Sequence, residues 1–349
     1  MTGRIYLDHA ATTPLLPAAR AAMDQGFSAW ANPSSPHAEG RAAKALLEGA
    51  RARLAAALDW GGAVLFTAGA SEALAIALTR SKANAVLASA TEHDAVLRHV
   101  RSDCRLPVDA DGIVLLPNHI EAGTLFAIQQ VNSETGVIQP LDDLAERIHA
   151  AGAKLLADCS QGAGKLPLPQ GADMAVISAH KLGGPVGIGA LLVQDLALLH
   201  PVGGQEQGYR AGTEAMPLAA GFAAAVEQGA QWLDEALHWR GELDAAVSAA
   251  GGVIVASASS RLATIGSYRM PGMSAQAQLI RFDMAGIAVS AGSACSSGTL
   301  KASGVLTAMG WPEEHAAEVI RVSLGHNTRE SDIQAFLAQW LALYSGSRT

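Results

Sequence analysis

The chain has 349 residues, of which 50% are hydrophobic and 16% charged, and its formal net charge at pH 7 is -8. This length can bury one large core or two linked ones, and the acidic balance argues against nucleic acid or an anionic membrane surface as the partner. No apolar run approaches the roughly 20 residues of a membrane-spanning helix and no signal segment opens the chain, so we expect a cytoplasmic protein.

Strands and helices are expected to alternate from the N-terminus. A short apolar piece at residues 4–14 and a Pro- and Ser-rich loop at residues 32–37 precede a strongly periodic helix. Its apolar stripe consists of Ala43, Leu46, Leu47, Ala50, Leu54 and Leu58. Residues 63–67 form the next strand, and the small residues 68–70 turn directly into a helix. The first N–H groups of that helix suit a phosphate, although a plain strand-to-helix turn fits equally well.

Two more units of this kind follow. Residues 86–88 make a strand, after which Thr91 is expected to be the N-cap of a helix that carries His93 in its first turn. An exposed histidine at such a position is usually structural, so His93 has a role only if the turn faces a site. Residues 124–131 form the next strand, and a helix is expected over residues 141–151.

The stretch from Lys154 to Lys181 contains two short apolar runs that predict buried parallel strands. The first run ends in Asp158, and the second is followed by Ser178, His180 and Lys181. Ligands bind at the carboxyl ends of strands in open α/β sheets, so an acid and an amine should converge there. A nucleophilic lysine most often serves pyridoxal phosphate, whose ring nitrogen needs a carboxylate. On residue types alone, a capping aspartate and a solvated lysine explain the pattern equally well.

The glycine series GGPVGIGALLV, which follows Lys181, could suggest dinucleotide binding. It lacks the G-x-G-x-x-G order and leads into a strand rather than a helix, so we reject that reading. The next distinctive segment is the loop GGQEQGYRAGTE at residues 203–214. An Ala-rich helix is expected after it, running towards Trp239.

A change of composition near residues 235–245 marks the expected boundary between two lobes. The second lobe should be a smaller α+β unit, because strands alternate there with an amphipathic helix and a closing helix. Its strands are expected at residues 253–256, 263–268 and 319–324. We therefore predict a large lobe of residues 12–238 and a small lobe made of residues 1–11 and 239–349.

The three cysteines, Cys104, Cys159 and Cys295, are too few and too scattered for a disulfide framework or a structural zinc site, and we expect no bound metal. Cys295 lies in AGSACSSG, residues 291–298. A buried structural cysteine normally lies in an apolar run, whereas this one is flanked by glycine, serine and alanine. The surroundings of Cys295 therefore favour a reactive thiol on an exposed loop.

The motifs together resemble the cysteine desulfurases, pyridoxal phosphate enzymes of the class V aminotransferase group that supply sulfur for iron–sulfur clusters. The matching pieces run in the family's order over nearly the whole chain: YLDHAATTP, NPSSPH, FTAGASE, TEHDAV, ETGVIQP, DCSQ, SAHK, GPVGIGAL, GGQEQGYRAGTE, SAGSACSSG and IRVSLG. The cysteine motif resembles the subgroup with a long catalytic loop. The resemblance implies an α/β, fold type I transferase with a large mixed, mainly parallel sheet domain and a smaller α+β domain.

The resemblance also implies the catalytic roles. Lys181 would hold the cofactor as a Schiff base and later move the Cα proton of the substrate. Cys295, as a thiolate, would attack the sulfur of bound cysteine and leave alanine and an enzyme persulfide. Arg321 would bind the substrate carboxylate bidentately, with Asn32 nearby. His93 would stack on the cofactor ring and shuttle protons.

Further residues would contact the cofactor in a protein of this family. Asp158 would pair with the pyridinium nitrogen, and Gln161 would donate to the ring oxygen. The phosphate would be held by Ala70, Ser71, Ser178 and His180, and by Thr213 of the neighbouring subunit. A homodimer is thus an implication of the resemblance and not of composition.

Several positions depart from the family's pattern. Ser133 replaces an asparagine that contacts the cofactor, Ala215 replaces another asparagine, and apolar residues 73–75 replace polar ones. The chain also ends soon after Tyr344, where relatives carry a tail near their scaffold partner. We expect these changes to alter cofactor affinity and partner choice more than the type of reaction.

The leading hypothesis is an L-cysteine desulfurase that passes sulfur to an acceptor protein, such as an iron–sulfur scaffold, or to another thio-cofactor pathway. One alternative is a related lyase or transaminase, such as a selenocysteine lyase. Another is an accessory scaffold protein with low activity. The presence of Lys181, Asp158, Arg321 and Cys295 together argues against this last alternative, because a degenerate scaffold need not keep all four.

Overall fold

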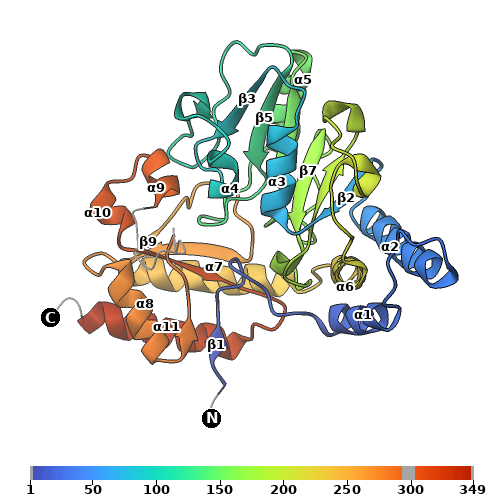
Figure 1. Cartoon of the computed structure of the whole chain (residues 1–349). Coiled ribbons are helices and arrows are strands. Elements are labelled where there is room, and N and C mark those ends of the chain that lie inside the picture. The colour runs from blue at the N-terminus through green and yellow to red at the C-terminus, as the bar shows by residue number, and fades with distance from the viewer. Residues whose placement is uncertain (1–2, 293–302, 347–349) are drawn as a thin grey trace.

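A computed structural model of the chain describes residues 3–292 and 303–346 (Figure 1). Its large sheet has seven strands in the order β2-β8-β7-β6-β5-β3-β4. They are β2 (Ala63–Thr67), β3 (Ala85–Ser89), β4 (Arg105–Leu106), β5 (Thr124–Gln129), β6 (Lys154–Asp158), β7 (Met174–Ser178) and β8 (Gly189–Val193). Strand β8 is antiparallel to both neighbours, and all pairs from β7 to β4 are parallel. The expected mixed, mainly parallel sheet is confirmed.

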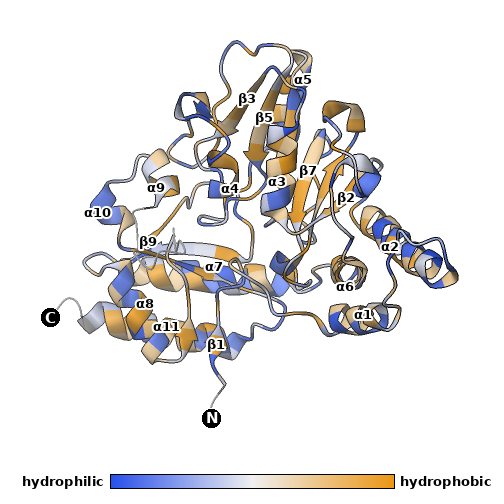
Figure 2. Cartoon of the chain, in the orientation of Figure 1, coloured by the Kyte–Doolittle hydropathy of each residue, from blue (hydrophilic) through white to orange (hydrophobic). Residues whose placement is uncertain are grey.

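Helices cover both faces of this sheet, which is why its strands are continuous apolar runs. Phe126 and Ile128 of β5 belong to the core on one face, whereas Leu125 and Ala127 belong to the core on the other. The first core includes residues of α2 (Ala38–Ala57), α5 (Leu141–Ala150) and α6 (Met216–Glu227), and the second includes residues of α3 (Ala70–Thr79) and α4 (Asp94–Leu97). The buried strands are accordingly orange in Figure 2. Helix α1 (Pro17–Ser28) packs on α6.

A separate core joins the N-terminal strand to the last third of the chain. It contains Leu7 together with buried side chains between Ala236 and Tyr344, among them Phe282, Phe336 and Trp340. Its strands are β1 (Ile5–Tyr6), β9 (Val253–Ile254), β10 (Ile265–Arg269), β11 (Ile287–Ala288) and β12 (Val319–Ser323), and its helices are α7 (Leu233–Ala250), α8 (Ala275–Met284) and α11 (Glu330–Gly346). Strands β12, β10 and β9 form an antiparallel sheet, and β1 pairs with β11 in parallel. Helices α9 (Gly304–Ala308) and α10 (Glu313–Ala316) precede β12.

Three local predictions are wrong. The N-cap of α4 is His93 and not Thr91, because the Thr91 hydroxyl bonds the Ser89 hydroxyl at 2.9 Å instead. Leu46 is exposed, because the 3.6-residue period aligns its neighbour Leu47, and not Leu46, with the buried side of α2. The predicted Ala-rich helix is two helices, α6 and α7, separated by Gly229 with a φ of 60°.

Within the two described segments, no helix is both long enough and apolar enough to cross a lipid bilayer.

Candidate active site

The carboxyl ends of β3, β5, β6 and β7 meet at one edge of the large sheet, because these strands pair in parallel. Gln129 at the end of β5 lies beside Asp158, and Asp158 lies beside Val176 of β7. Strand β7 ends at Ser178, and the short 3₁₀ helix η2 (Ala179–Lys181) follows it directly. The topology therefore brings the predicted acid and the predicted amine to the same edge.

Lys181 is mostly buried beneath the N-terminal segment of the chain. Its Nζ donates to the main-chain oxygens of Ala10 at 2.6 Å and Ala11 at 2.8 Å. Burial, and next the charge of Arg321, lower the pKa of Lys181 from 10.5 to about 8, and nearby carboxylates oppose this shift. Near pH 8 a large fraction of the amine is neutral, which is the state that a nucleophilic lysine needs.

Asp158 and Gln161 are buried polar residues on the connection that follows β6. Asp158 Oδ1 accepts from the N–H of Ser160 at 2.9 Å, and Gln161 Nε2 donates to the oxygen of Ala10 at 2.9 Å. Gln161 Oε1 is buried without a hydrogen-bond partner among the described residues. Buried polar atoms are costly without partners, so this atom indicates a ligand or water. Donation from Gln161 to a ligand oxygen requires its amide to turn away from Ala10.

The turn between β2 and α3 forms a close-packed cradle at the same edge. Ala70 and Ser71 begin α3, where main-chain N–H groups lack partners within the helix. Gly69 has a φ of 153°, a backbone conformation that residues with a side chain rarely adopt. A Cβ on Gly189 would lie 2.7 Å from the carbonyl carbon of Gly69. This close approach of β8 fixes the turn, whose N–H groups are suited to bind an anion.

Ser178 and His180 come from the neighbouring strand end. Ser178 is almost completely buried at the end of β7. The Nδ1 atom of His180 lies 3.2 Å from the hydroxyl oxygen of Thr12. Burial, and next the charge of Lys181, lower the pKa of His180 from 6.5 to about 4. The ring is therefore neutral near pH 7 and can donate one N–H.

His93 is exposed and caps α4, with Nδ1 accepting from the N–H of Ala95 at 3.1 Å. The adjacent Glu92 is buried, and its Oε1 accepts from the N–H of Gln129 at 2.6 Å. Burial, and next the charge of Asp158, raise the pKa of Glu92 well above 4.5. Sequence reasoning missed Glu92 as a site residue, although it stands in the TEHDAV motif.

Arg321 reaches this region from β12 and is almost buried. Its Nη1 donates to the main-chain oxygen of Ser133 at 2.8 Å, and its Nη2 donates to Asp8 Oδ1 at 2.7 Å. Its Nε has no hydrogen-bond partner among the described residues. The guanidinium therefore joins the small core to the large sheet and keeps its Nε–H for a ligand. Asp8 is a second site residue that sequence reasoning did not single out, although it lies in YLDHAATTP.

Other predicted site residues are not joined to this cluster. Within residues 3–292 and 303–346, no hydrogen bond links Asn32 or Thr213 to it. Asn32 is exposed, and its Oδ1 accepts from the N–H of Ser34 at 2.9 Å in the loop before α2. Thr213 is exposed in the loop before α6. Cys295 lies outside the described residues, whereas Cys159 is buried, which raises the pKa of its thiol well above 9.0.

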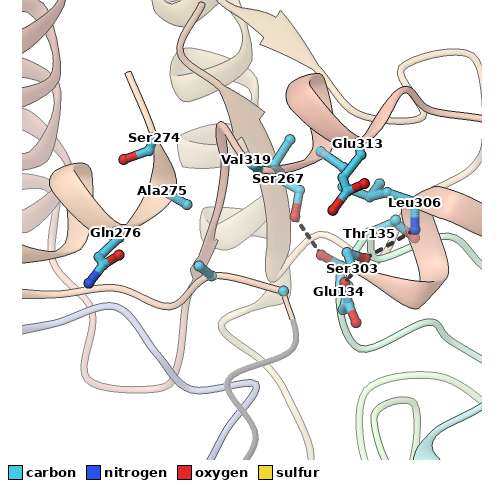
Figure 3. Close-up of a pocket in the computed structure, with 14 residues that line it drawn as sticks. Glu134, Thr135, Ser267, Ser274, Ala275, Gln276, Ser303, Leu306, Glu313 and Val319 are labelled. Carbon is cyan, nitrogen blue, oxygen red and sulfur yellow. Dashed lines mark hydrogen bonds between the residues drawn. The ribbon is translucent and has the colours of Figure 1, made fainter. Parts of the chain in front are cut away.

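A cavity of about 220 Å³ is lined by residues from both described segments, among them Gly292 and Ser303 (Figure 3). Glu134 Oε2 accepts from the Ser303 hydroxyl, and a Cβ on Gly292 would lie 2.7 Å from the same oxygen. The Ser267 hydroxyl donates to the main-chain oxygen of Glu134. Burial raises the pKa of Glu134. Gly292 and Ser303, on either side of Cys295 in the sequence, thus both lie against one partly buried carboxyl group.

The side chains at this edge fit pyridoxal phosphate. Lys181 offers an amine with a lowered pKa for the aldehyde, Asp158 a buried carboxyl group for the ring nitrogen, and the N-terminus of α3 a cradle for the phosphate. The Gln161 amide would donate to the ring oxygen once its Nε2 turns away from Ala10. No group of three or more His, Cys, Asp or Glu side chains in the described part of the chain could hold a metal ion.

Comparisons with known proteins identify the family. Residues 5–336 match the family model described as Aminotransferase class-V. The chain is 34% identical to a cysteine desulfurase of Cereibacter sphaeroides, over 96% of this chain and 94% of that protein. It is 33% identical to an IscS-like cysteine desulfurase of Mycobacterium tuberculosis, over 95% of this chain and 94% of that protein.

Solved structures are similar over the same length. The crystal structure of a NifS-like protein from Rickettsia africae superposes with a TM-score of 0.88 at 31% identity, over 98% of this chain and 99% of that chain. A structure titled "SspA in complex with cysteine" superposes with a TM-score of 0.78 at 28% identity, over 92% of this chain and 98% of that chain. The expected fold type is confirmed by these likenesses.

Proposed function

The chain belongs to the aminotransferase class-V family and is an enzyme of the cysteine desulfurase family, and from this premise we propose that it converts L-cysteine to L-alanine. We further propose that the released sulfur remains on Cys295 as a persulfide. One observation carries the proposal. The pKa of the Lys181 amine is lowered to about 8, and the charges of Asp158 and Arg321 both act on this amine. That arrangement joins a nucleophile, a carboxylate for a cofactor and a guanidinium for a substrate carboxylate.

The proposed cofactor is pyridoxal phosphate, which the family implies. When bound, it supplies an electron sink that lets bonds at the substrate Cα break. The residues proposed to hold it are Ala70, Ser71, His93, Ser133, Asp158, Gln161, Ser178, His180 and Lys181, with Thr213 from the neighbouring subunit. Asp158 would keep the ring nitrogen protonated, because a buried carboxylate favours a positive charge beside it.

Each proposed catalytic residue has a defined task. Arg321 holds the substrate carboxylate, with Asn32 as the second substrate contact. Lys181, whose amine is partly neutral near pH 8, takes the proton from Cα and returns it, and His93 moves protons beside the ring. Cys295, as a thiolate, attacks the substrate sulfur. An S–S bond forms, the Cβ–S bond breaks with its electron pair left on carbon, and that carbon takes up a proton to become the methyl group of alanine.

The persulfide would then pass its outer sulfur to an acceptor protein, and we propose an iron–sulfur scaffold as that acceptor. Thiol exchange of this kind needs an accessible sulfur, so Cys159 is a poor candidate because it is buried. A cytoplasmic location stays a prediction.

We propose that the protein works as a homodimer of two-lobed subunits. The large lobe would comprise residues 12–238, and the small lobe residues 1–11 and 239–349. The separate core that joins Leu7 to residues of the last third of the chain supports this division. Thr213, which is exposed, would contribute to the phosphate site of the other subunit. Mixing a Lys181→Ala subunit with a Thr213→Val subunit would test the sharing, because only the mixed dimer holds one complete site.

Mass spectrometry of the protein after treatment with cysteine tests the proposed reaction. The purified protein should absorb at about 400 nm through its lysine-bound cofactor, and Lys181→Ala should lose that band. Wild type should gain about 32 Da on the peptide containing Cys295 and should release alanine. Cys295→Ser should respond spectrally to cysteine without gaining sulfur, whereas the control Cys104→Ser should behave as wild type. Sulfur on Cys104 or Cys159, or normal turnover by Cys295→Ser, contradicts the proposal.

A further inference from the structure

Lys165 is a second partly buried lysine close to Lys181, and it has no part in the proposed reaction. It lies in the connection after β6, which also carries Gln161. Its Nζ donates to the main-chain oxygen of Gln161 at 2.9 Å and to that of Lys181 at 3.0 Å. One amino group therefore bridges the segments that carry two proposed cofactor residues.

The main-chain oxygen of Lys181 accepts a second hydrogen bond, from the Thr13 hydroxyl at 3.2 Å. The N–H of Thr13 donates to the oxygen of His180 at 2.8 Å, so the η2 turn is held from the side of the N-terminal segment as well. The side chain of Lys181, in contrast, bonds Ala10 and Ala11. Lys165 and Thr13 thus fix the main chain of Lys181 independently of its own amine.

The surroundings of Lys165 contain several other basic groups. Burial, and next the charge of Lys181, lower the pKa of Lys165 from 10.5 to about 7, and no carboxylate is among the groups that shift it. His9 lies close enough for the charge of Lys165 to lower its pKa, after the larger effects of burial and of His326. A lysine that loses water without gaining a carboxylate partner is unfavourable for stability. Among the described residues, two main-chain oxygens and not an ion pair account for the position of the Lys165 amine.

We propose that Lys165 is a positioning residue for Lys181: by binding the main-chain oxygens of Gln161 and Lys181, it sets the direction in which the Lys181 side chain enters the active site. This inference rests on the proposed function of Lys181. Small misplacements of a reacting group lower the rate strongly, because catalysis depends on the distance and alignment of the reacting atoms. The loss of Lys165 should therefore affect steps at the Lys181 amine more than binding of the substrate carboxylate, which depends on Arg321.

The experiment compares Lys165→Met, Lys165→Arg and Thr13→Val with wild type. Lys165→Met keeps the length of the side chain but removes the donors, and Lys165→Arg keeps donors and charge. Thr13→Val removes the other donor to Lys181 with little change of shape. Lys44→Met, on the exposed surface of α2, is the matched control. The measurements are kcat and KM for cysteine, the rate at which pyridoxal phosphate attaches to each apoprotein, and the melting temperature of each apoprotein.

Lys165→Met should lower kcat at least tenfold and slow cofactor attachment by a similar factor, with KM within twofold of wild type. Lys165→Arg should recover kcat to within threefold of wild type, Thr13→Val should lower kcat about threefold, and Lys44→Met should match wild type. The inference is overturned if Lys165→Met keeps kcat and attachment within twofold while only its melting temperature falls.

The variants separate this inference from the proposed function. If Lys165→Met does not fold, an unchanged kcat in Thr13→Val overturns the inference, and a threefold loss supports it. A Lys165→Arg variant no faster than Lys165→Met also overturns it. If wild type releases no alanine from cysteine, the proposed function fails, while the attachment rates of the apoproteins still decide whether Lys165 positions Lys181.

Discussion

Replacing Asp8 by asparagine should strengthen cysteine binding while weakening the fold. Asp8 Oδ1 accepts from Arg321 Nη2 at 2.7 Å, and the two side chains are 22% and 8% exposed. Removing one partner of a buried ion pair costs about 3–5 kcal/mol. Asparagine keeps an oxygen that can accept from Nη2, and Asp8 is partly exposed, so we expect Asp8→Asn to lower the free energy of unfolding by about 2 kcal/mol.

The same change should lower the KM for cysteine. In the proposed reaction the substrate carboxylate would share the Arg321 guanidinium with Asp8, and two carboxylates about 6 Å apart repel by about 3 kcal/mol at an effective dielectric constant of about 20. Partial exposure of Asp8 reduces this repulsion to roughly half, which corresponds to about a tenfold lower KM. Because Asp8 raises the pKa of Lys181, its neutralisation should also shift that pKa below about 8.

Urea unfolding of the apoprotein measures the first effect, and the initial rate of alanine release at varied cysteine concentration measures the second. Asp283→Asn is the control, because Asp283 pairs with Arg4 on the surface, where both side chains are more than half exposed. Its loss should change unfolding by less than about 1 kcal/mol and leave KM unchanged. An equal or higher KM in a folded Asp8→Asn protein would refute the competition between Asp8 and the substrate.

Three further predictions follow from the same geometry. The rate at which pyridoxal phosphate attaches to the apoprotein, followed by borohydride trapping, should rise with pH with its midpoint at about 8, because burial lowers the pKa of the Lys181 amine to about 8. A midpoint at about 10, the ordinary range of a lysine, would contradict this. Ser133→Asn should slow cofactor loss during dialysis several-fold, since one added hydrogen bond contributes about 1 kcal/mol, and faster loss would show a rearranged pocket. Arg51→Met should cost about 3 kcal/mol in urea unfolding, because it leaves the buried Glu206 carboxylate without its partner at 2.7 Å; a cost below about 1 kcal/mol would refute it.

The large sheet could be predicted from sequence because its strands are buried on both faces. A strand such as β6 or β7 then reads as an uninterrupted apolar run, and polar side chains begin where the run ends. The break between α6 and α7 could not be predicted in this way. Gly229 is tolerated within a helix, and only its φ of 60° shows that the chain turns there.

Pairs of side chains distant in sequence were the harder part of the site. Asp8 and Arg321 are 313 positions apart, and they meet because Asp8, which follows β1 closely, forms a parallel bridge with Ser323 of β12. The hydrophobic pattern does not predict that pairing, because β1 has two residues and is too short to show a period. The N-cap of α4 was predicted wrongly for a local reason. The Thr91 hydroxyl bonds Ser89, whereas the His93 side chain accepts from the N–H of Ala95, and the sequence does not show which side chain makes which bond.

The N-terminal segment explains why the site needs both cores. Residue 7 packs in the small core, residue 8 pairs with Arg321 of β12, and residues 10, 11 and 13 bond Lys181, which follows the large sheet. Residues 8–13 therefore contact both the guanidinium that is proposed to bind the substrate and the amine that is proposed to bind the cofactor. A shift of one core against the other must change the distance between those two groups unless the segment moves too. In the proposed reaction, the distance between the substrate carboxylate and the reacting amine would thus depend on residues 8–13, which the sequence alone presents only as part of a short apolar piece.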